Sequence, residues 1–507
     1  MEKRKSAVGD GEPEDINQNN LFVKIMEYAE SLKQDTKETR KDLLRNGIVD
    51  ECIDALNKLS KSNPPIKDNP SSPTSPKNPT SKLKEKEFVA RESLLTELFE
   101  INHFGTIRNI FTSVFLILFV NNIVEEYFIE SSTKLQAITG NFKTIDKVFY
   151  IWMVMFVSTL ILVHISFQVW AYAANKSTKV WNKSWLTVYV LYLCAFFYFP
   201  TKYAIILDLT PVCSMIILAE QLRMMMKTHS FVRHNAEKIL DKPNSKQCPA
   251  MSKYLYFLFV PTLIYRDEYP RTSHIRVKFV LMNFCQVIAC IFYISVVLID
   301  HFLVFHDFGL NTCTKTRVIQ AIVSAMVPGT ILFFCANFLL LHSWMNAFAE
   351  MLRFADRQFY TDWWNSYNFA EYYRTWNIVV HDWLYTYVFR DLALLLPKNR
   401  LVPLSSVFII SSIVHDYIMT FTFRVFMPVF LIMFGGIGGL LFFVPHKGSK
   451  QNGKIFFWTG VIIGTSIMTS LYSIEWYARQ NCPPFSDNFL DLVVPRMWVC
   501  YRNASSS

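Results

Sequence analysis

The sequence lacks the short motifs that mark several large classes of enzyme. It contains no Walker A loop, no GxSxG elbow, no HExxH helix and no GxGxxG stretch. ATP-driven pumping, serine hydrolysis and zinc proteolysis therefore have no support in the sequence. The ten cysteines include no CxxC pair, which argues against a metal ribbon or a thioredoxin-like site. We accordingly expect neither a metal nor a bound cofactor.

The sequence is also short of charge and of glycine. Charged residues make up 18% of the 507 positions, against about 25% in an average soluble protein, and there are only 15 glycines. Hydrophobic residues make up 51%. This composition predicts an all-α, polytopic membrane protein with a soluble N-terminal head. Because residues 1–20 are polar rather than a signal peptide, we expect the first membrane helix to direct insertion.

Apolar runs of about 20 residues, long enough to cross a bilayer, recur along the chain. We place nine of them at 107–127, 148–170, 184–203, 204–222, 278–304, 318–342, 402–422, 428–444 and 455–475. The third and fourth can form one hairpin bent at Pro200. The shorter run Tyr254–Tyr265 is expected to be re-entrant or interfacial, since it is too short to cross.

The basic residues predict how these spans are oriented. Lysine and arginine are concentrated in the head, in the loops 223–276 and 349–400, and at Lys447, Lys450 and Lys454. With nine spans and a cytosolic N-terminus, all of these segments face the cytosol, and the C-terminal tail lies in the lumen. Thiols oxidise there, so we expect a disulfide between Cys482 and Cys500. The net charge of +10 follows from the basic loops, or it serves anionic headgroups or a phosphate-bearing substrate.

Composition divides the chain into four parts. Residues 1–87 form the head and a Pro/Ser-rich linker, 88–106 an interfacial amphipathic helix, 107–476 the membrane domain and 477–507 the lumenal tail. In the head, apolar residues recur at helical spacing at Leu21, Ile25, Met26 and Ala29 and again at Leu44, Ile48, Cys52 and Leu56. These stripes predict self-association of the head or, equally well, a loosely ordered amphipathic tail.

The residues suited to chemistry are concentrated between Phe359 and Tyr417. His415 lies near the middle of a predicted span, and Ser411, four residues earlier, shares its helical face. A titratable side chain at bilayer depth usually faces a cavity, and a neutral imidazole suits general-base catalysis. The alternative is a structural histidine bonded to a neighbouring helix. Asp416 points to another side of the helix, so we do not expect it to orient His415.

A second polar face precedes this span. Arg374, Asn377 and His381 are spaced three and four apart, so that a continuous helix stacks them on one face. The amide of Asn377, with Trp376 beside it, is suited to stabilising a developing oxyanion, and we count both as catalytic candidates. Arg374 and Arg400 are suited to holding phosphates, with interfacial anchoring as the alternative role. Two such polar faces brought together in an apolar protein form a reaction site.

Several longer stretches identify a family. FYTDWWN at 359–365, NIVVHDW at 377–383 and SSIVHDY at 411–417 resemble motifs of the membrane-bound O-acyltransferase superfamily. YSIEWYARQNCP at 472–483 is similar to its sterol O-acyltransferase branch. The likeness covers residues 88–502 and does not include the head.

The resemblance implies a fold, an activity and a set of site residues. The fold is about nine membrane helices around a tunnel in the endoplasmic reticulum membrane. The activity is transfer of a long-chain acyl group from acyl-CoA to cholesterol or a related sterol. The implied residues are catalytic His415 and Asn377, the acyl-CoA tunnel residues Arg374, His381, Arg400 and Ser411, the sterol-site residue His103, and the disulfide Cys482–Cys500. Assembly into a homo-oligomer, a dimer or tetramer joined through the head, is implied as well.

Two other functions fit the residues. The first is the same chemistry on diacylglycerol or a long-chain alcohol, because only the acceptor tunnel differs. The second is a lipid transporter or scaffold without turnover, since a buried histidine and clustered aromatic residues suit that too. We expect membrane lipid around the protein and no nucleic-acid partner.

Overall fold

The computed structural model describes residues 85–128, 138–174, 179–241, 248–301, 303–310, 313–444, 448–484 and 490–498. The chain divides into two compact units, Met1–Lys82 and Leu83–Ser507. The first unit, with the predicted head stripes, lies outside the described residues. The described residues of the second unit form helices and, apart from two isolated bridges, no β-structure, which confirms the all-α class.

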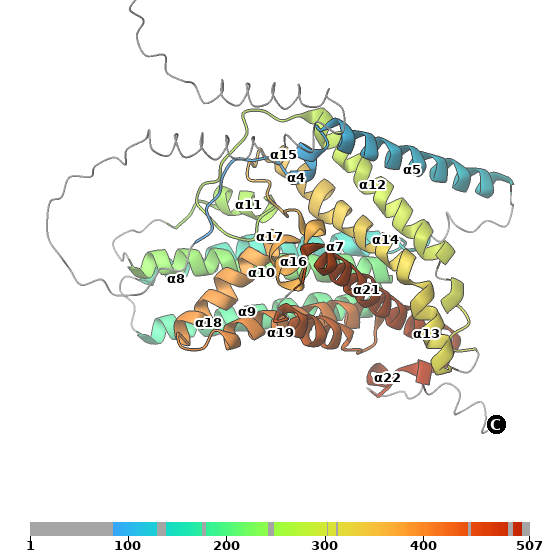
Figure 1. Cartoon of the computed structure of the whole chain (residues 1–507). Coiled ribbons are helices and arrows are strands. Elements are labelled where there is room, and N and C mark those ends of the chain that lie inside the picture. The colour runs from blue at the N-terminus through green and yellow to red at the C-terminus, as the bar shows by residue number, and fades with distance from the viewer. Residues whose placement is uncertain are drawn as a thin grey trace, which may run out of the picture. The chain divides into compact units, whose positions relative to one another are not determined.

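The helices follow one another along the chain in the colour order of Figure 1. They are α4 (Leu94–Leu98), α5 (Asn102–Phe128), α7 (Ile145–Val157), η1 (Ser158–Val163), α8 (His164–Ala174), α9 (Lys179–Ile206), α10 (Pro211–Asp241), α11 (Met251–Phe259), α12 (Val277–His301), η2 (Leu303–Phe305), α13 (Lys315–Ser324), α14 (Met326–Asn337), η3 (Phe338–Trp344), α15 (Met345–Met351), η4 (Trp363–Asn365), α16 (Phe369–Thr375), α17 (Ile378–Leu384), η5 (Tyr385–Phe389), α18 (Arg390–Leu395), α19 (Leu401–Phe423), η6 (Leu431–Gly438), α20 (Gly439–Phe442), α21 (Lys450–Asn481) and α22 (Leu490–Val493).

Seven helical segments within the described ranges are long and apolar enough to cross a membrane. They are Asn102–Glu125, Ile138–Ala173, Lys179–Ile206, Val277–Asp300, Met326–Met351, Leu401–Phe423 and Lys450–Asn481. The predicted span 428–444 corresponds to a shorter apolar helix, Leu431–Phe442, and the predicted span 204–222 to the first part of α10. The count of nine therefore stays a prediction.

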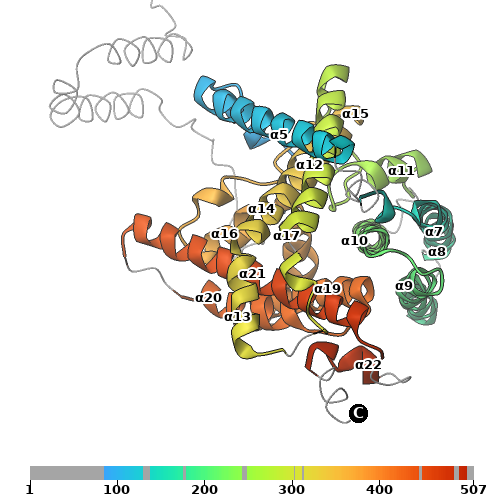
Figure 2. The same cartoon turned by 90° about the vertical axis from the view of Figure 1, so that its right-hand side faces the viewer.

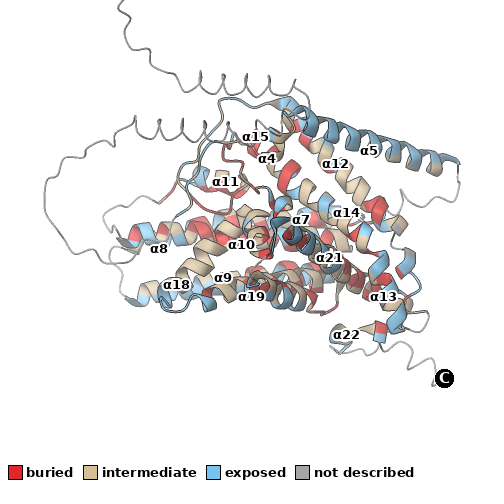
Figure 3. Ribbon diagram, in the orientation of Figure 1, coloured by how far each residue is buried: buried red, intermediate tan, exposed pale blue. Residues whose placement is uncertain are grey.

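Helix α5 lies along the outside of the helical domain (Figure 3). Only 6% of the most apolar stretch of this helix is buried, and Phe111 and Ile117 are largely exposed. It contacts α12 through aromatic rings: the ring centroids of Phe115 and Phe119 lie 6.4 and 5.1 Å from that of Phe292. The two helices lie close together in Figure 2. An apolar helix with so little burial is suited to contact with lipid tails.

The turn between the third and fourth predicted spans is not at Pro200. Helix α9 continues through Pro200, and the chain turns only at residues 207–210. Proline has no N–H to donate to the carbonyl oxygen of Phe196 one turn earlier. The side-chain Nε2 of Gln221 on α10 lies 2.7 Å from that oxygen and 2.9 Å from the Phe197 oxygen. Helix α10 thus supplies the missing donor and lets α9 pass the proline.

The predicted re-entrant or interfacial run Tyr254–Tyr265 comprises most of the short helix α11 and a non-helical segment after it. The last carbonyls of a helix need donors from elsewhere. Lys227 on α10 donates to the Phe257 and Val260 oxygens, both at 2.6 Å, and Arg223 donates to the Leu258 oxygen at 2.6 Å. Helix α10 therefore fixes the end of α11 by two cationic side chains.

The predicted interfacial helix over 88–106 is wrong. Residues 85–93, which we call the strap, are not helical, α4 has only five residues, and α5 begins at Asn102. The Arg91 N–H donates to the Ala355 oxygen at 2.8 Å, and the Arg357 N–H donates to the Arg91 oxygen at 3.1 Å. Backbone hydrogen bonds to a distant segment thus replace those that a helix would make within itself.

Candidate functional site

The imidazole of His415 lies on α19, inside a candidate membrane span. Its Nδ1 atom is 2.7 Å from the carbonyl oxygen of Ser411. A carbonyl oxygen only accepts hydrogen bonds, so Nδ1 carries the ring proton. Nε2 then keeps its lone pair, which is the form that a general base requires. Ser411 and His415 share a helix face as predicted, although the contact uses the Ser411 backbone.

Aromatic rings surround this imidazole. The Phe430 ring stacks on it with a centroid distance of 5.1 Å, and the Phe434 ring lies at 6.1 Å. Phe434 also contacts Tyr373 of α16 at 5.3 Å. His415 and Tyr373, which precedes Arg374, therefore share a ring neighbour. Through it α16, η6 and α19 meet at one place.

The carboxylate of Asp416 serves the backbone after α19 rather than the imidazole. It accepts from the N–H groups of Phe430 at 3.0 Å and Leu431 at 2.8 Å, and from the Tyr472 hydroxyl at 3.3 Å. This geometry confirms that Asp416 does not orient His415 by a direct hydrogen bond. It caps the start of η6 and so fixes Phe430, whose ring covers the imidazole.

Asn377 does not lie within a continuous helix, so the prediction of one helix carrying Arg374, Asn377 and His381 is wrong. Helix α16 ends at Thr375, and α17 begins at Ile378. Asn377 is the N-cap of α17, where Asn is a preferred residue, and its Oδ1 accepts from the Val380 N–H at 3.2 Å. The Oδ1 end is thereby occupied, which leaves the Nδ2 group as the end that can donate to a substrate.

The other predicted site residues lie on neighbouring elements. Arg374 is exposed in the last turn of α16, His381 is half-buried on α17, and Arg400 is exposed at the N-cap of α19. Helix α16 contacts α17, while η5 and α18, which continue α17, contact α19. Trp376 stacks on Tyr372 with centroids 5.9 Å apart. The predicted acyl-CoA residues are thus brought to one group of packed helices.

Two predicted features are not brought to this group. His103 is exposed in the first turn of α5. Cys482 is buried and caps the end of α21, but Cys500 lies outside the described residues, so their disulfide stays a prediction. Within the described part of the chain, no group of three His, Cys, Asp or Glu side chains is arranged to hold a metal ion.

Glycines of η6 allow α16 and α19 to approach it closely. A Cβ atom on Gly438 would lie 2.5 Å from the hydroxyl oxygen of Tyr373, and one on Gly435 would lie 2.6 Å from the Ser412 hydroxyl oxygen. Neither separation is tolerated by van der Waals radii. The tight packing of Tyr373 against η6 therefore depends on glycine.

Sequence reasoning did not identify Tyr373, Phe430 or Phe434 as neighbours of the base. The only signal was the spacing of Phe430 and Phe434, four apart in an apolar run that contains four closely spaced glycines after them. That spacing is common in membrane helices, where it indicates packing in general. Only the position of η6 beside α19 gives these rings a role at the site.

Comparison with known proteins shows the family to which the chain belongs. The family model described as MBOAT, the membrane-bound O-acyltransferase family, matches residues 138–474. Sterol O-acyltransferase 1 of Mus musculus is 38% identical over 427 residues, which cover 82% of this chain and 79% of that protein. Sterol O-acyltransferase 2 of Rattus norvegicus is 38% identical over 433 residues, covering 82% and 81%.

The likeness also extends beyond the part that motifs alone could align. Sterol O-acyltransferase 2 of Homo sapiens is 35% identical over 507 residues, which cover 99% of this chain and 96% of that protein, and the alignment therefore includes most of the head. Identity at this level over most of both chains, together with the family match over more than half of this one, settles the family. The chain belongs to the membrane-bound O-acyltransferase family and, within it, to the sterol O-acyltransferases.

Proposed function

We propose that this protein transfers a long-chain fatty acyl group from acyl-CoA to the hydroxyl of a sterol, which gives a sterol ester and free CoA. The observation that carries this proposal is the His415 imidazole, held on a membrane helix with Nδ1 protonated and Nε2 available as a base. The names of the relatives, all sterol O-acyltransferases, support the sterol as acceptor.

The reaction follows from the groups at the site. Nε2 of His415 accepts the proton of the sterol hydroxyl as the oxygen attacks the thioester carbonyl carbon. The carbonyl oxygen becomes an oxyanion, which the Nδ2 group of Asn377 stabilises by hydrogen bonding. Collapse of this intermediate breaks the carbon–sulfur bond and releases CoA thiolate, which takes the proton back from the imidazolium. Protons and charge balance without a further cofactor.

The substrates reach the base from different surroundings. Arg374, His381, Arg400 and Ser411 line the acyl-CoA tunnel, and the guanidinium groups of the two arginines contact the CoA phosphates. The sterol enters laterally from the bilayer, with His103 at a sterol site near α5. The ester product is more apolar than either substrate and leaves into the lipid.

The protein is a multi-pass membrane protein. We place it in the endoplasmic reticulum, with the N-terminus in the cytosol, the C-terminal tail in the lumen and a Cys482–Cys500 disulfide in that tail. Its assembly is a homo-oligomer joined through the head. The basic loops and the relatives' names support this placement, and the orientation follows from counting nine spans.

The acceptor is tested by giving purified protein one radiolabelled acyl-CoA and a panel of alcohols. We expect labelled ester with cholesterol and little with diacylglycerol or a long-chain alcohol. Labelled triacylglycerol in excess of sterol ester would assign the protein a different acceptor with the same chemistry. A His415→Ala protein serves as the blank, since it retains the membrane domain without the base.

A further inference from the structure

The strap is tied to the membrane domain by its charged side chains. Four of the five charged residues in the segment 85–93 form ion pairs within unit Leu83–Ser507. The pairs are Glu85 with Arg266 and Arg390, Lys86 with Asp382, Arg91 with Asp356, and Glu92 with Arg276 and Arg357. The partners lie on segments far apart in sequence, so the strap holds several of them together.

One of these pairs reaches the candidate site. Lys86 Nζ lies 2.8 Å from Asp382 Oδ2, and the two side chains are only 18% and 21% exposed. The other carboxylate oxygen, Oδ1, lies 3.4 Å from Nδ1 of His381. Asp382 therefore stands between the strap and His381. Burial raises the pKa of Asp382, but the hydrogen bond from His381 and the Lys86 ammonium outweigh burial and leave that pKa below its usual value.

The helix that carries Asp382 depends on outside contacts. Helix α17 follows directly on its N-cap Asn377 and continues into η5 and α18, and the first N–H groups of such a helix have no partner within it. Its first N–H, that of Ile378, donates to the Phe359 oxygen at 2.9 Å. The Trp383 indole N–H donates to the Met226 oxygen at 2.9 Å on its inner side. The Lys86 pair is a further tie to this helix.

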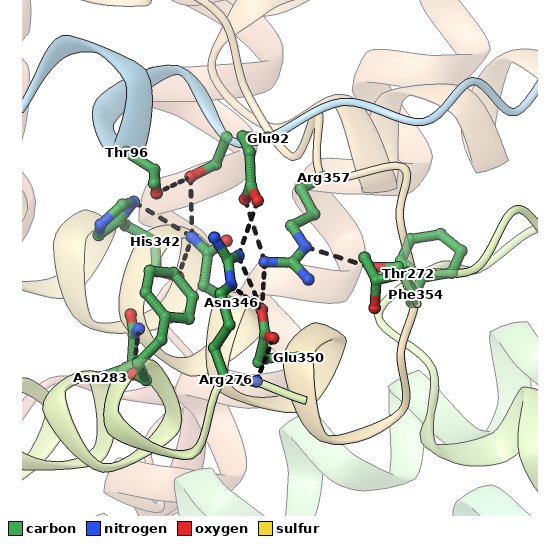
Figure 4. A network of polar contacts seen from close by, with 12 residues as sticks. Glu92, Thr96, Thr272, Arg276, Asn283, His342, Asn346, Glu350, Phe354 and Arg357 are labelled. Carbon is green, nitrogen blue, oxygen red and sulfur yellow. Dashed lines mark hydrogen bonds and ion pairs between the residues drawn. The ribbon is translucent and has the colours of Figure 1, made fainter. Parts of the chain in front are cut away.

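The strap reaches the start of α17 by a second route, which begins at the charged network around Glu92 and Arg357 in Figure 4. Glu92 and Glu350 share the guanidinium groups of Arg276 and Arg357, at N–O distances between 2.7 and 3.1 Å. Two negative and two positive charges balance there, which is what burial of Glu350 and Arg357 requires. Arg357 lies two residues before Phe359, whose oxygen receives the Ile378 N–H.

We propose that Lys86 is a positioning residue for acyl transfer, which through Asp382 fixes His381 and helix α17, whose N-cap is Asn377. The inference rests on the proposed function. It assigns the strap to the catalytic unit rather than to the linker that precedes it. Because His381 belongs to the acyl-CoA side of the site, loss of the pair affects the use of acyl-CoA and leaves the use of sterol unchanged.

The test compares three full-length variants in a steady-state assay of ester formation. Lys86→Met removes the charge and keeps the length of the side chain, Lys86→Arg keeps the charge, and Glu87→Gln changes the neighbouring exposed residue of the strap as a matched control. Lys86 lines a cavity of about 480 Å³, so its replacement does not open a void in a packed core. We expect Lys86→Met to raise the KM for acyl-CoA about fivefold, equivalent to about 1 kcal/mol, with the sterol KM unchanged.

Lys86→Arg should restore the wild-type KM for acyl-CoA, and Glu87→Gln should leave it unchanged. A Lys86→Met protein with the kinetics of Glu87→Gln would overturn the proposal. So would a rise of both KM values together with a lower melting temperature, because that pattern indicates only a folding role. If the wild-type protein formed no ester, the proposed function itself would be contradicted. This result differs from the two variant results that would overturn the role of Lys86.

Discussion

The Nδ1 atom of His415 lies 2.7 Å from the carbonyl oxygen of Ser411, one turn earlier on the same helix. The imidazole is thus oriented by the backbone of its own helix rather than by a carboxylate. The nearest carboxylate in sequence, Asp416, caps the next helical segment instead. This arrangement fixes the tautomer while keeping a formal negative charge out of direct contact with the imidazole.

Replacement of His415 by Ala should abolish ester formation without loss of the folded protein. Loss of a general base usually lowers the rate by about 10²–10⁴-fold. His274→Ala, at an exposed histidine away from this helix, is the control and should keep full activity. The rate of acyl transfer and the size of the detergent-solubilised protein are measured for both. Turnover near the wild-type rate in His415→Ala would remove this residue from the mechanism.

Asn377 allows its two roles to be separated. Asp at this position keeps an oxygen that caps α17 but has no amide donor, while Ala loses both. We expect Asn377→Asp to retain the melting temperature and to lose about 10²–10³-fold in kcat, the cost of one oxyanion donor. Asn377→Ala should lose activity and stability together. An active Asn377→Asp protein would show that the amide does not contact the reacting carbonyl.

The contact between Gly438 and Tyr373 predicts a compensating pair. Gly438→Ala should lower activity and stability, because its Cβ atom would lie 2.5 Å from the Tyr373 hydroxyl oxygen. Tyr373→Phe removes that oxygen, so that the nearest ring atom lies 3.6 Å away and the closest remaining atom is the Met433 carbonyl oxygen at 3.3 Å. The double variant should therefore recover most of what Gly438→Ala loses. Additive losses in a double-mutant cycle would contradict this packing.

The Lys86–Asp382 pair has a defined pH dependence. The pKa of Asp382 is lower in the folded protein than in an unfolded chain, where it is about 3.9. Its contribution to stability is therefore fully present above that value and is lost as the pH falls through the folded pKa. The difference in melting temperature between wild type and Asp382→Asn should be constant from about pH 5 to 7 and shrink in more acidic buffer. A melting-temperature difference that grows as the pH falls would mean that folding raises the pKa of Asp382, which would contradict this prediction.

Two truncations that differ by five residues locate the end of the catalytic unit. Removal of residues 1–82 takes away the first unit and leaves the strap. Removal of residues 1–87 also takes away Glu85 and Lys86. We expect both to form smaller oligomers, because the head is predicted to join protomers, and only the longer deletion to raise the KM for acyl-CoA. If the two truncated proteins had the same KM for acyl-CoA, the strap would have no role in the reaction.

The sequence predicted the helix that carries His415 because this depends on local features, while the role of His415 as the base stays a prediction. A histidine in an apolar run is a conspicuous signal, and the i, i+4 relation of Ser411 and His415 follows from helix geometry alone. The all-α class followed from composition for the same reason. Asn377 was chosen because an amide next to such a segment is suited to stabilising an oxyanion, and this role also stays a prediction.

The errors arose where distant segments compete with local pattern. The periodicity of 88–106 predicts a helix, but the strap makes its backbone hydrogen bonds with residues 355 and 357. The spacing of Arg374, Asn377 and His381 predicts one helix, but Asn377 caps a new one. Pro200 predicts a turn, but Gln221 donates to the Phe196 carbonyl oxygen, which the proline leaves without a backbone donor. In each case the deciding partner is remote in sequence, and no local pattern reveals it.

Release of the CoA thiol by purified protein tests the central claim most directly. The assay follows free thiol with acyl-CoA alone, with acyl-CoA and cholesterol, and with both substrates and the His415→Ala variant. If the protein transfers acyl groups to sterol with His415 as base, thiol release requires the sterol, matches the sterol ester formed mole for mole, and disappears in the variant. Bound lipid with no thiol release, or release that neither the sterol nor His415→Ala affects, would contradict the account.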